Sequence, residues 1–310
     1  MLDLTDTPLP TLPPRDPRSP KGDFGRAMLI GGSRGMSGAI AMAGLACLRS
    51  GAGLVSLGVP RCVQPEVAAF SPAYTTRGLT DDDPGVLYWA NCFDLERNED
   101  DFDVWAVGPG LGEPSSTGDL VGRMHRSFTS PMVIDADGLN GLAIFLARYG
   151  ERPDELLAPR VLTPHPGEFA RLAGDDTLAA RARGGEQERV EAAATLADRH
   201  GAGRTVVVLK GAGTVVTDGE RFAVNANGNP GMATGGSGDV LTGVITALVA
   251  QGLEAFDAAR LGVHVHGLAG DLAAASVGQV SLVATDLIDH LPAAFQSLGR
   301  PVAVPSQDLP

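Results

Sequence analysis

Residues 229–239 have the sequence Asn-Pro-Gly-Met-Ala-Thr-Gly-Gly-Ser-Gly-Asp and lead directly into an apolar helical pattern. That pattern covers residues 240–250, with apolar side chains at helical spacing on one face. The glycines therefore lie at a helix N-terminus, where an anion can approach the free backbone N–H groups closely. We expect a phosphate-binding anion hole there, formed by Gly235, Gly236, Ser237 and Gly238.

Asp239 is the acidic residue at the end of this loop. A carboxylate beside an anion hole repels a phosphate, so its presence indicates a chemical task, such as accepting a proton from a substrate hydroxyl. We therefore predict that Asp239 is the catalytic base. The alternative is a tight turn in which Ser237 or Asp239 only caps the helix. The loop matches neither a Walker A motif nor a Rossmann fingerprint.

Short apolar runs alternate with helical patterns along the whole chain. The runs that predict strands are Ala27–Ile30, Leu54–Val59, Val104–Val107, Met132–Ile134, Val161–Leu162 and Thr205–Leu209. The patterns that predict helices are Ala39–Leu48, Leu139–Ala147, Gly167–Leu172, Arg189–His200, Val240–Ala250, Ala255–Val277 and Asp286–Leu298. Thr214–Thr217 and Arg221–Asn225 predict a hairpin. This order predicts an α/β fold with a mostly parallel central sheet and helices on both faces.

Glycine clusters follow several of the predicted strands. They are Gly31-Gly32, Gly108–Gly112 and Gly211–Gly213. Ligands bind at the carboxyl ends of parallel strands, so the position of these clusters indicates that they contribute to function.

Lysine is rare in this chain. Of 24 Lys and Arg residues, only Lys21 and Lys210 are lysines, and each precedes a glycine. A compact ammonium group suits a phosphate oxygen in a tight loop better than a planar guanidinium does. Lys210 directly follows a predicted strand, so we predict that it binds phosphate, and Lys21 is a second candidate. The alternative for both is a surface lysine beside a turn.

The segment Thr163–Glu168 follows a predicted strand and opens a helix. Pro164 and Pro166 restrict the backbone on both sides of His165, so the ring has a defined direction. We predict that His165 contacts a ligand. The alternative is a proline turn in which Glu168 complements the first helical turn.

Two pairs of residues are candidates for metal binding. Asp135 and Asp137 follow a strand and share a face if the backbone stays extended. They could then hold Mg²⁺ or substrate hydroxyls, or Asp137 could cap the next helix. His264 and His266 lie two apart on a predicted helix and point away from each other. For these two we expect packing or a local hydrogen bond.

The composition excludes several classes of partner. The 310 residues carry a formal net charge of −13 and no basic stripe, so we expect no nucleic-acid partner. No apolar stretch is long enough to span a membrane. Three scattered cysteines and an N-terminus unlike a signal peptide predict a cytoplasmic protein. We expect proline-rich tails at residues 1–20 and 300–310, and one domain at residues 21–299.

From about Lys21 to Leu298 the chain resembles the ADP/ATP-dependent NAD(P)H-hydrate dehydratase family of the ribokinase-like superfamily. The residues that carry the resemblance are Lys21-Gly-x-Phe24-Gly25, Gly31-Gly32-Ser33 with Ser37-Gly38-Ala39, Gly108-Pro-Gly-Leu-Gly112, Asp135-Ala-Asp137, Thr163-Pro-His-Pro-Gly-Glu168, Lys210-Gly-x-x-Thr214, residues 229–239 and His266-Gly-x-Ala-Gly-Asp271. Each motif alone is weak, but all of them in this order are specific. The resemblance implies a three-layer ribokinase-like fold.

The resemblance also implies two binding regions. It places the AMP portion of a nucleotide at Lys210, Gly211, Ala212, Gly213, Thr214 and Gly238. It places hydrated NAD(P)H at Ala39, Gly110, Gly112, His165 and Asp239. The implied reaction is dehydration of the S-epimer of hydrated NADH or NADPH through phosphorylation of its C6 hydroxyl. Mg²⁺ is the implied cofactor, and ADP is preferred to ATP as the donor.

The resemblance further implies a homo-oligomer, a tetramer by analogy with the family. Some relatives carry an additional N-terminal epimerase domain, and only residues 1–20 precede Lys21 here. We therefore expect a separate epimerase that acts on the same metabolite. Two alternatives stay open: a kinase of a small hydroxymethyl vitamin precursor, and a non-catalytic nucleotide-sensing module that needs the anion hole but not Asp239.

Overall fold

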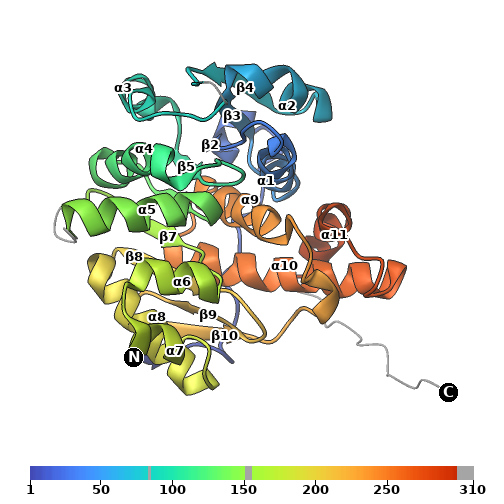
Figure 1. Cartoon of the computed structure of the whole chain (residues 1–310). Coiled ribbons are helices and arrows are strands. Elements are labelled where there is room, and N and C mark those ends of the chain that lie inside the picture. Colours follow the sequence, from blue (N-terminus) through green and yellow to red (C-terminus); the bar gives the residue numbers. More distant parts are fainter. Residues whose placement is uncertain (83–84, 151–155, 299–310) are drawn as a thin grey trace.

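The computed structural model describes residues 1–82, 85–150 and 156–298. The C-terminal tail predicted for residues 300–310 lies outside these residues. Strands and helices alternate along most of the described chain, and three helices follow one another between residues 237 and 297 (Figure 1).

The elements that the sequence predicted differ from the observed ones by only a few residues at most ends, whereas helices α2, α3, α4 and α7 were not predicted. The strands are β1 (Leu2–Asp3), β2 (Arg26–Ile30), β3 (Leu54–Pro60), β4 (Thr75–Leu79), β5 (Val104–Val107), β6 (Met132–Ile134), β7 (Arg160–Leu162), β8 (Thr205–Leu209), β9 (Thr214–Thr217) and β10 (Arg221–Asn225). The helices are α1 (Ser37–Arg49), α2 (Gln64–Phe70), α3 (Asn91–Glu96), α4 (Pro114–Ser127), α5 (Ala136–Tyr149), α6 (Pro166–Ala173), α7 (Asp176–Arg181), α8 (Glu186–Gly201), α9 (Ser237–Ala250), α10 (Ala255–Val277) and α11 (Ala284–Ser297).

Within the described residues, the strands form one ten-stranded sheet in the order β1-β10-β9-β8-β7-β6-β5-β2-β3-β4. The strands from β8 to β4 in this order are parallel to one another, and β9 is antiparallel to β8 and β10. The mostly parallel sheet and the β9–β10 hairpin are therefore confirmed. The sequence did not indicate β1 or β4, because β1 has two residues and β4 is a half-exposed edge strand without an apolar run.

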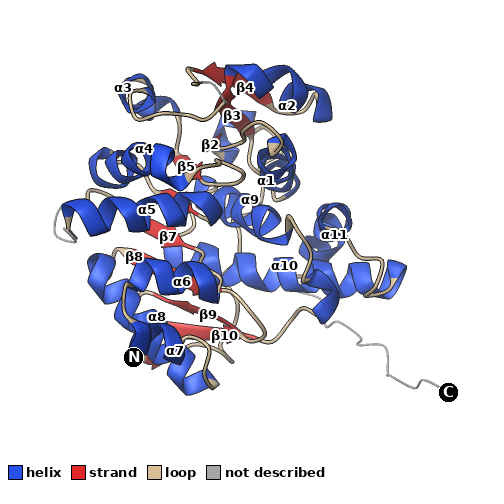
Figure 2. Cartoon of the chain, in the orientation of Figure 1, coloured by secondary structure: helices blue, strands red, loops and turns tan. Residues whose placement is uncertain are grey.

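Alternate residues of each strand face opposite helical layers. In β2, Ala27 and Leu29 belong to the core with α1, α9, α10 and α11. Met28 and Ile30 belong to the core with α4, α5, α6 and α8. Figure 2 shows these helices on the two sides of the sheet. Because both faces are covered, the strands are apolar throughout, and the predicted three-layer α/β architecture is confirmed.

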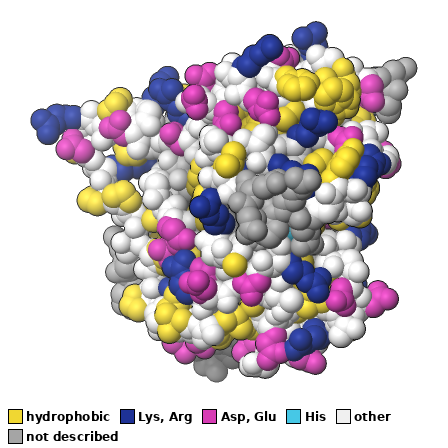
Figure 3. Space-filling model, turned by 90° about the vertical axis from the view of Figure 1, so that its left-hand side faces the viewer, with side chains coloured by type: hydrophobic (Ala, Val, Ile, Leu, Met, Phe, Trp, Pro, Cys, Tyr) yellow, Lys and Arg dark blue, Asp and Glu magenta, His cyan; other side chains and the backbone are white. Residues whose placement is uncertain are grey.

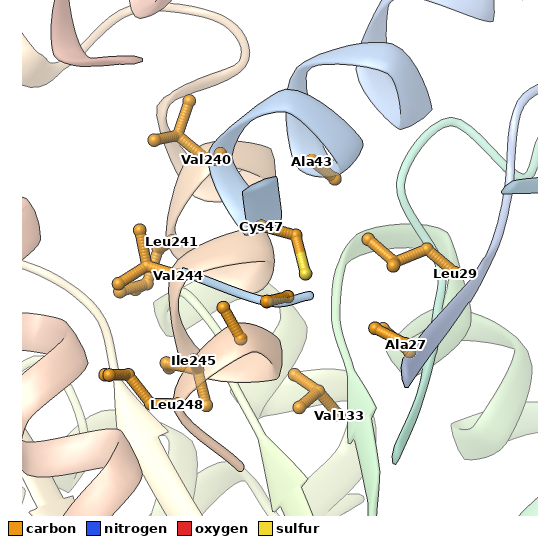
Figure 4. Close-up of a cluster of buried hydrophobic side chains, with 14 of the residues drawn as sticks. Ala27, Leu29, Ala43, Cys47, Val133, Val240, Leu241, Val244, Ile245 and Leu248 are labelled. Atoms are coloured by element: carbon orange, nitrogen blue, oxygen red, sulfur yellow. The ribbon is translucent and has the colours of Figure 1, made fainter. Parts of the chain in front are cut away.

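Helix α9 packs closely against α1 and the sheet. Figure 4 shows Cys47 of α1 between Leu29 of the sheet and Val244 of α9, and all three are fully buried. Gly243 permits this approach, since a Cβ atom there would lie 2.1 Å from the carbonyl oxygen of Ala43. The contact holds the axis of α9 in place and therefore decides where its N-terminus points.

The N-terminal segment lies along one edge of the sheet. Strand β1 pairs in parallel with β10. Arg260 of α10 donates hydrogen bonds to the carbonyl oxygens of Leu4, Thr7 and Pro8 at 2.5–3.1 Å. These bonds satisfy backbone carbonyl groups in a proline-rich segment where few backbone groups pair with a neighbouring strand.

The strand order reverses between β2 and β5. The chain runs outward from β2 to β3 and β4 and then returns to β5 on the other side of β2. Ligands of open parallel sheets bind outside the carboxyl ends of the strands at such a switch point. The loops after β2, β5, β6, β7 and β8 all leave the sheet at this edge, and they contain most of the predicted site residues.

The surface carries charges of both signs. Figure 3 shows acidic and basic side chains interspersed on one face, without a continuous basic stripe there. Among the residues described, none of the helices combines the length and the apolar character that a membrane crossing requires.

Gly243→Ala is expected to lower the free energy of unfolding by about 2–3 kcal/mol, because the added methyl group forces α9 away from α1. Gly38→Ala is the matched control, since a Cβ atom at this helical position meets nothing within 4 Å. That control should be neutral or stabilising by up to about 1 kcal/mol. Urea unfolding of both variants measures the difference, and equal stabilities would contradict the close α1–α9 contact.

Candidate active site

Helix α9 begins without a side-chain cap. Its N-cap residue is Gly236, whose φ of 92° is a left-handed conformation that favours glycine. Ser237 instead lies with its Oγ 3.5 Å from Nε2 of His266, and no described residue donates a hydrogen bond to Asp239. The alternative that Ser237 or Asp239 caps the helix is therefore wrong. The uncapped first turn, with Gly235 just before it, is the arrangement that an anion hole requires.

The loop before α9 is anchored to α10 by Asp271. The Asp271 carboxylate accepts hydrogen bonds from the backbone N–H of Gly228 and from Nδ2 of Asn229, both at 3.0 Å. Asn229 Oδ1 accepts from the N–H of Gly231 at 3.0 Å. The sequence motif contained Asp271, but its anchoring role follows only from these contacts.

His266 and His264 make local hydrogen bonds, as expected. Nε2 of His266 lies 2.9 Å from the carbonyl oxygen of Ser237, and burial lowers the pKa of His266 to about 4. The neutral ring therefore donates to Ser237 and supports the start of α9. Nδ1 of His264 lies 3.0 Å from the side-chain amide of Asn227.

Lys210 lies at the carboxyl end of β8 and points toward the first turn of α9. Its Nζ is 2.6 Å from Oδ1 of Asp135 and 3.7 Å from Oε2 of Glu168. A Cβ atom at Gly238 would lie 3.2 Å from the same Nζ. Burial disfavours the ammonium, but the carboxylates of Asp135, Glu168 and Asp239 outweigh this effect and raise the pKa of Lys210. A fixed positive charge thus lies beside the uncapped N–H groups.

Asp135 and Asp137 do not share a face. Helix α5 begins at Ala136, so the backbone does not stay extended, and Asp135 contacts Lys210 whereas Asp137 accepts from the N–H of Gly112 at 3.0 Å. Asp137 is therefore not the cap of α5, contrary to that alternative. Ala136 has a φ of 50°, an unusual value for a residue with a side chain, which is typical of backbone strain at functional sites.

Asp239 lies in the first turn of α9, largely buried among charged groups. Burial raises its pKa, the Asp135 carboxylate adds to this and Lys210 opposes it, and the result is a pKa of about 7. A carboxylate with this pKa at neutral pH is half ionised and suited to accept a proton.

Two glycine loops interlock at the switch point. The N–H of Gly32 donates to the carbonyl oxygen of Pro109 at 2.8 Å, and Ser33 Oγ donates to that of Gly110 at 2.9 Å. A Cβ atom at Gly110 would lie 2.9 Å from the Cβ of Ala39. The predicted substrate contacts Ala39, Gly110 and Gly112 are thus brought together on one wall of the site.

The Lys210–Thr214 loop is held by Arg189 of α8. The guanidinium donates hydrogen bonds to the carbonyl oxygens of Leu209 at 3.2 Å and Gly213 at 2.9 Å, and to that of Ala212. Gly211 and Gly213 adopt φ values of 143° and 63°, which only glycine adopts easily. The sequence offered no signal for Arg189, because it lies on a helix remote in the chain.

His165 is the N-cap residue of α6. Its Nδ1 accepts from the N–H of Gly167 at 2.9 Å, and Glu168 Oε2 accepts from the N–H of His165 at 2.8 Å. The first-turn role of Glu168 is therefore confirmed, and this reciprocal cap, together with the prolines, fixes the ring. The His165 side chain is 51% exposed, so it remains accessible to a ligand.

Lys21 lies away from this cluster. It is exposed in the 3₁₀ turn that precedes β2, and a Cβ atom at Gly53, just before β3, would lie 1.7 Å from its carbonyl oxygen. It therefore belongs to the amino edge of the sheet, opposite the site. A cavity of about 460 Å³ lined by Arg15, Phe24 and Phe295 also lies at that amino edge, away from the loops that contain the other predicted site residues.

The carboxylates of the site determine how it could hold a metal ion. The described residues contain no group of three or more His, Cys, Asp or Glu side chains arranged to hold a metal ion. Burial is the main reason that the pKa values of Asp137, Glu168 and Asp239 are raised, and the Asp135 carboxylate raises each of them further, so a nearby cation would stabilise their ionised forms. Such an edge fits Mg²⁺ that is held mainly by nucleotide phosphates and water, with one protein carboxylate.

The chain is similar in sequence to proteins of one family. A family model described as NAD(P)H-hydrate dehydratase matches residues 27–293. The bifunctional NAD(P)H-hydrate repair enzyme of Thermofilum pendens is 41% identical over 95% of this chain and 54% of its own length. The chain thus spans about half the length of such relatives. The ADP-dependent (S)-NAD(P)H-hydrate dehydratase of Xanthomonas campestris is 34% identical over 96% of this chain and 95% of its own.

Solved structures show the same architecture. The ADP/ATP-dependent NAD(P)H-hydrate dehydratase of Bacillus subtilis, co-crystallised with ATP and Mg²⁺, superposes with a TM-score of 0.77 at 32% identity, over 93% of this chain and 95% of that one. A ribokinase-like superfamily protein of Enterococcus faecalis superposes with a TM-score of 0.74 at 26% identity, over 93% and 92% of the two chains. The fold is ribokinase-like, as the sequence resemblance implies.

Asp239→Asn is expected to increase stability at neutral pH. The folded state raises this pKa from 3.8 to about 7, so between these values it holds a proton that the unfolded state has released, and stability falls as pH rises. Each pKa unit is worth about 1.4 kcal/mol, so the variant should gain a few kcal/mol at pH 7 and above and almost nothing near pH 4.

Urea unfolding of both proteins across this pH range measures the gain. A stability difference between the variant and the wild type that stays constant with pH would show that Asp239 is not the group with the raised pKa.

Proposed function

Because this chain belongs to the NAD(P)H-hydrate dehydratase family, we propose that it dehydrates the S-epimer of hydrated NADH or NADPH, with a nucleotide as phosphoryl donor. One observation supports the chemistry above all others. Asp239, with a pKa of about 7, lies in the uncapped first turn of α9 beside the fixed ammonium of Lys210. A general base, an anion hole and a cation are thereby placed together, as phosphoryl transfer requires.

The proposed reaction removes water through a phosphorylated intermediate. Hydroxide is a poor leaving group, whereas phosphate is a good one. Asp239 accepts the proton of the C6 hydroxyl while this oxygen attacks the terminal phosphorus of the donor, and the bond between that phosphorus and the remaining nucleotide breaks. The lone pair of the ring nitrogen then expels phosphate from C6. Loss of a proton from C5 restores the double bond of the reduced nicotinamide.

The binding roles of the other residues are part of this proposal. The nucleotide lies along Lys210, Gly211, Ala212, Gly213 and Thr214 and reaches the anion hole at Gly238. Hydrated NAD(P)H lies against Ala39, Gly110, Gly112 and His165. Support comes from the geometry: Arg189 shapes the first loop, and the interlocked glycine loops bring Ala39, Gly110 and Gly112 together.

Mg²⁺ belongs to the proposal as the counter-ion of the nucleotide phosphates. Asp137 is the protein carboxylate best placed to contact it, because Asp135 already binds Lys210 with Oδ1 and accepts a hydrogen bond from Thr242 with Oδ2. When bound, Mg²⁺ supplies positive charge to the transferring phosphoryl group.

We further propose ADP as the preferred donor. The X. campestris relative, which matches 96% of this chain over 95% of its own length, is named ADP-dependent, and the B. subtilis relative was co-crystallised with ATP and Mg²⁺. An epimerase that acts on the same metabolite supplies the S-epimer in this proposal, and the protein works as a homo-oligomer, a tetramer by analogy with the family.

The first measurement is the recovery of reduced-nicotinamide absorbance from chemically hydrated NADH. We expect recovery with purified protein, Mg²⁺ and ADP, less with ATP, and none without nucleotide. No recovery, together with a stable phosphorylated product of a small hydroxymethyl compound, would favour the vitamin-precursor kinase instead.

Asp239→Asn should lower turnover by at least about 100-fold, because the C6 hydroxyl loses its proton acceptor. Nucleotide affinity, measured by calorimetry, should stay within a few-fold of the wild-type value. Asp257→Asn is the matched control, since Asp257 is also acidic in a first helical turn but lies at the start of α10. Full function in Asp239→Asn would support the nucleotide-sensing module.

A further inference from the structure

We propose that Thr242 is a positioning residue, whose hydroxyl fixes the Asp135 carboxylate so that Asp135 holds Lys210 against the first turn of α9. This inference rests on the proposed function, because it assigns to Lys210 the task of meeting the nucleotide phosphates. Neither the family resemblance nor the spacing of the motifs indicated Thr242.

The contacts form a continuous chain from the interior of α9 to the phosphate-binding edge. Thr242 is fully buried, and its Oγ1 lies 2.7 Å from Oδ2 of Asp135. The other carboxylate oxygen, Oδ1, lies 2.6 Å from Nζ of Lys210. Each oxygen of Asp135 thus has one short contact with a donor from a different element. Because both oxygens are engaged, the carboxylate plane cannot rotate without breaking one of these bonds.

The hydroxyl of Thr242 has two acceptors within reach. Its Oγ1 also lies 3.2 Å from the carbonyl oxygen of Gly238, one helical turn earlier. A bond to an ionised carboxylate is shorter and stronger than one to a neutral carbonyl, so the hydroxyl proton points to Asp135. The carbonyl group of Gly238 therefore does not need the Thr242 hydroxyl, whereas the orientation of the Asp135 carboxylate depends on it.

Two carboxylates attract the ammonium group of Lys210 and together determine its position. Its ammonium is 2.6 Å from Asp135 and 3.7 Å from Glu168. Loss of the Thr242 bond frees Asp135 to rotate and allows Lys210 to move toward Glu168. A displacement of about 1 Å in a catalytic cation costs up to about 100-fold in rate. The effect should therefore appear in nucleotide binding and in turnover, not only in stability.

Thr242→Val tests this role, because valine keeps the shape of threonine and removes the hydroxyl. We expect kcat to fall at least about tenfold and the nucleotide Kd, measured by calorimetry with Mg²⁺ and ADP, to rise about tenfold. Thr242→Ser retains the hydroxyl and should recover both values to within about threefold.

Thr246→Val is the matched control. Thr246 is fully buried on the same helix, and its Oγ1 donates only to the carbonyl oxygen of Thr242 at 2.6 Å. Its activity and nucleotide affinity should equal those of the wild type, while thermal unfolding shows whether the two valine variants are equally folded. If Thr242→Val does not fold, Thr242→Ala removes the same hydroxyl without placing an apolar branch against the carboxylate.

Kinetic and binding constants of Thr242→Val within twofold of those of Thr246→Val would overturn the proposal. Failure of the wild-type protein to dehydrate hydrated NADH would contradict the proposed function instead. In that case the calorimetric comparison of the same variants still decides whether Thr242 positions Lys210.

Discussion

The nearly buried ion pair between Lys210 and Asp135 is the contact on which the candidate site depends. It joins the ends of β6 and β8, and the Thr242 hydroxyl extends it into α9. Burying two charges is costly unless each is paired and hydrogen-bonded, and here both conditions hold. Helix α9 also packs closely against α1 at Gly243, and its uncapped N-terminus lies beside Lys210. The predicted anion hole at residues 235–238, Lys210 and Asp239 therefore lie together at this edge of the sheet.

The same arrangement is electrostatically unfavourable in the absence of a ligand. Asp239, Glu168 and Asp137 have raised pKa values, with burial as the main cause and the neighbouring Asp135 carboxylate adding to each. Lys210 partly offsets the charge of Glu168 and Asp239. Active sites commonly hold such destabilised groups, because a base that is fully stabilised as a carboxylate accepts protons poorly. The left-handed conformation of Ala136 adds backbone strain at the same edge.

A ribokinase-like fold explains how a dehydratase can use the machinery of a kinase. In the proposed reaction the protein contributes a base, an anion hole and a cation, which are the parts that phosphoryl transfer requires. Elimination then follows from the chemistry of the reduced nicotinamide ring. In the proposal, the two activities differ in the molecule that binds beside the Gly108–Gly112 loop and His165, and site chemistry rather than fold determines that difference.

The sequence alone determined the alternation of strands and helices, the glycine loops at the strand ends, and Lys210 and Asp239 as candidates, because these features depend on local periodicity and backbone freedom. The tertiary structure decided which residues meet. It separated Asp137 from Asp135, placed Lys21 at the opposite edge, added β1 and β4, and assigned Thr242, Arg189 and Asp271 to supporting contacts. Thr242 and Asp135 are 107 residues apart. No spacing along the chain encodes such a contact, since it arises only when the sheet and α9 pack together.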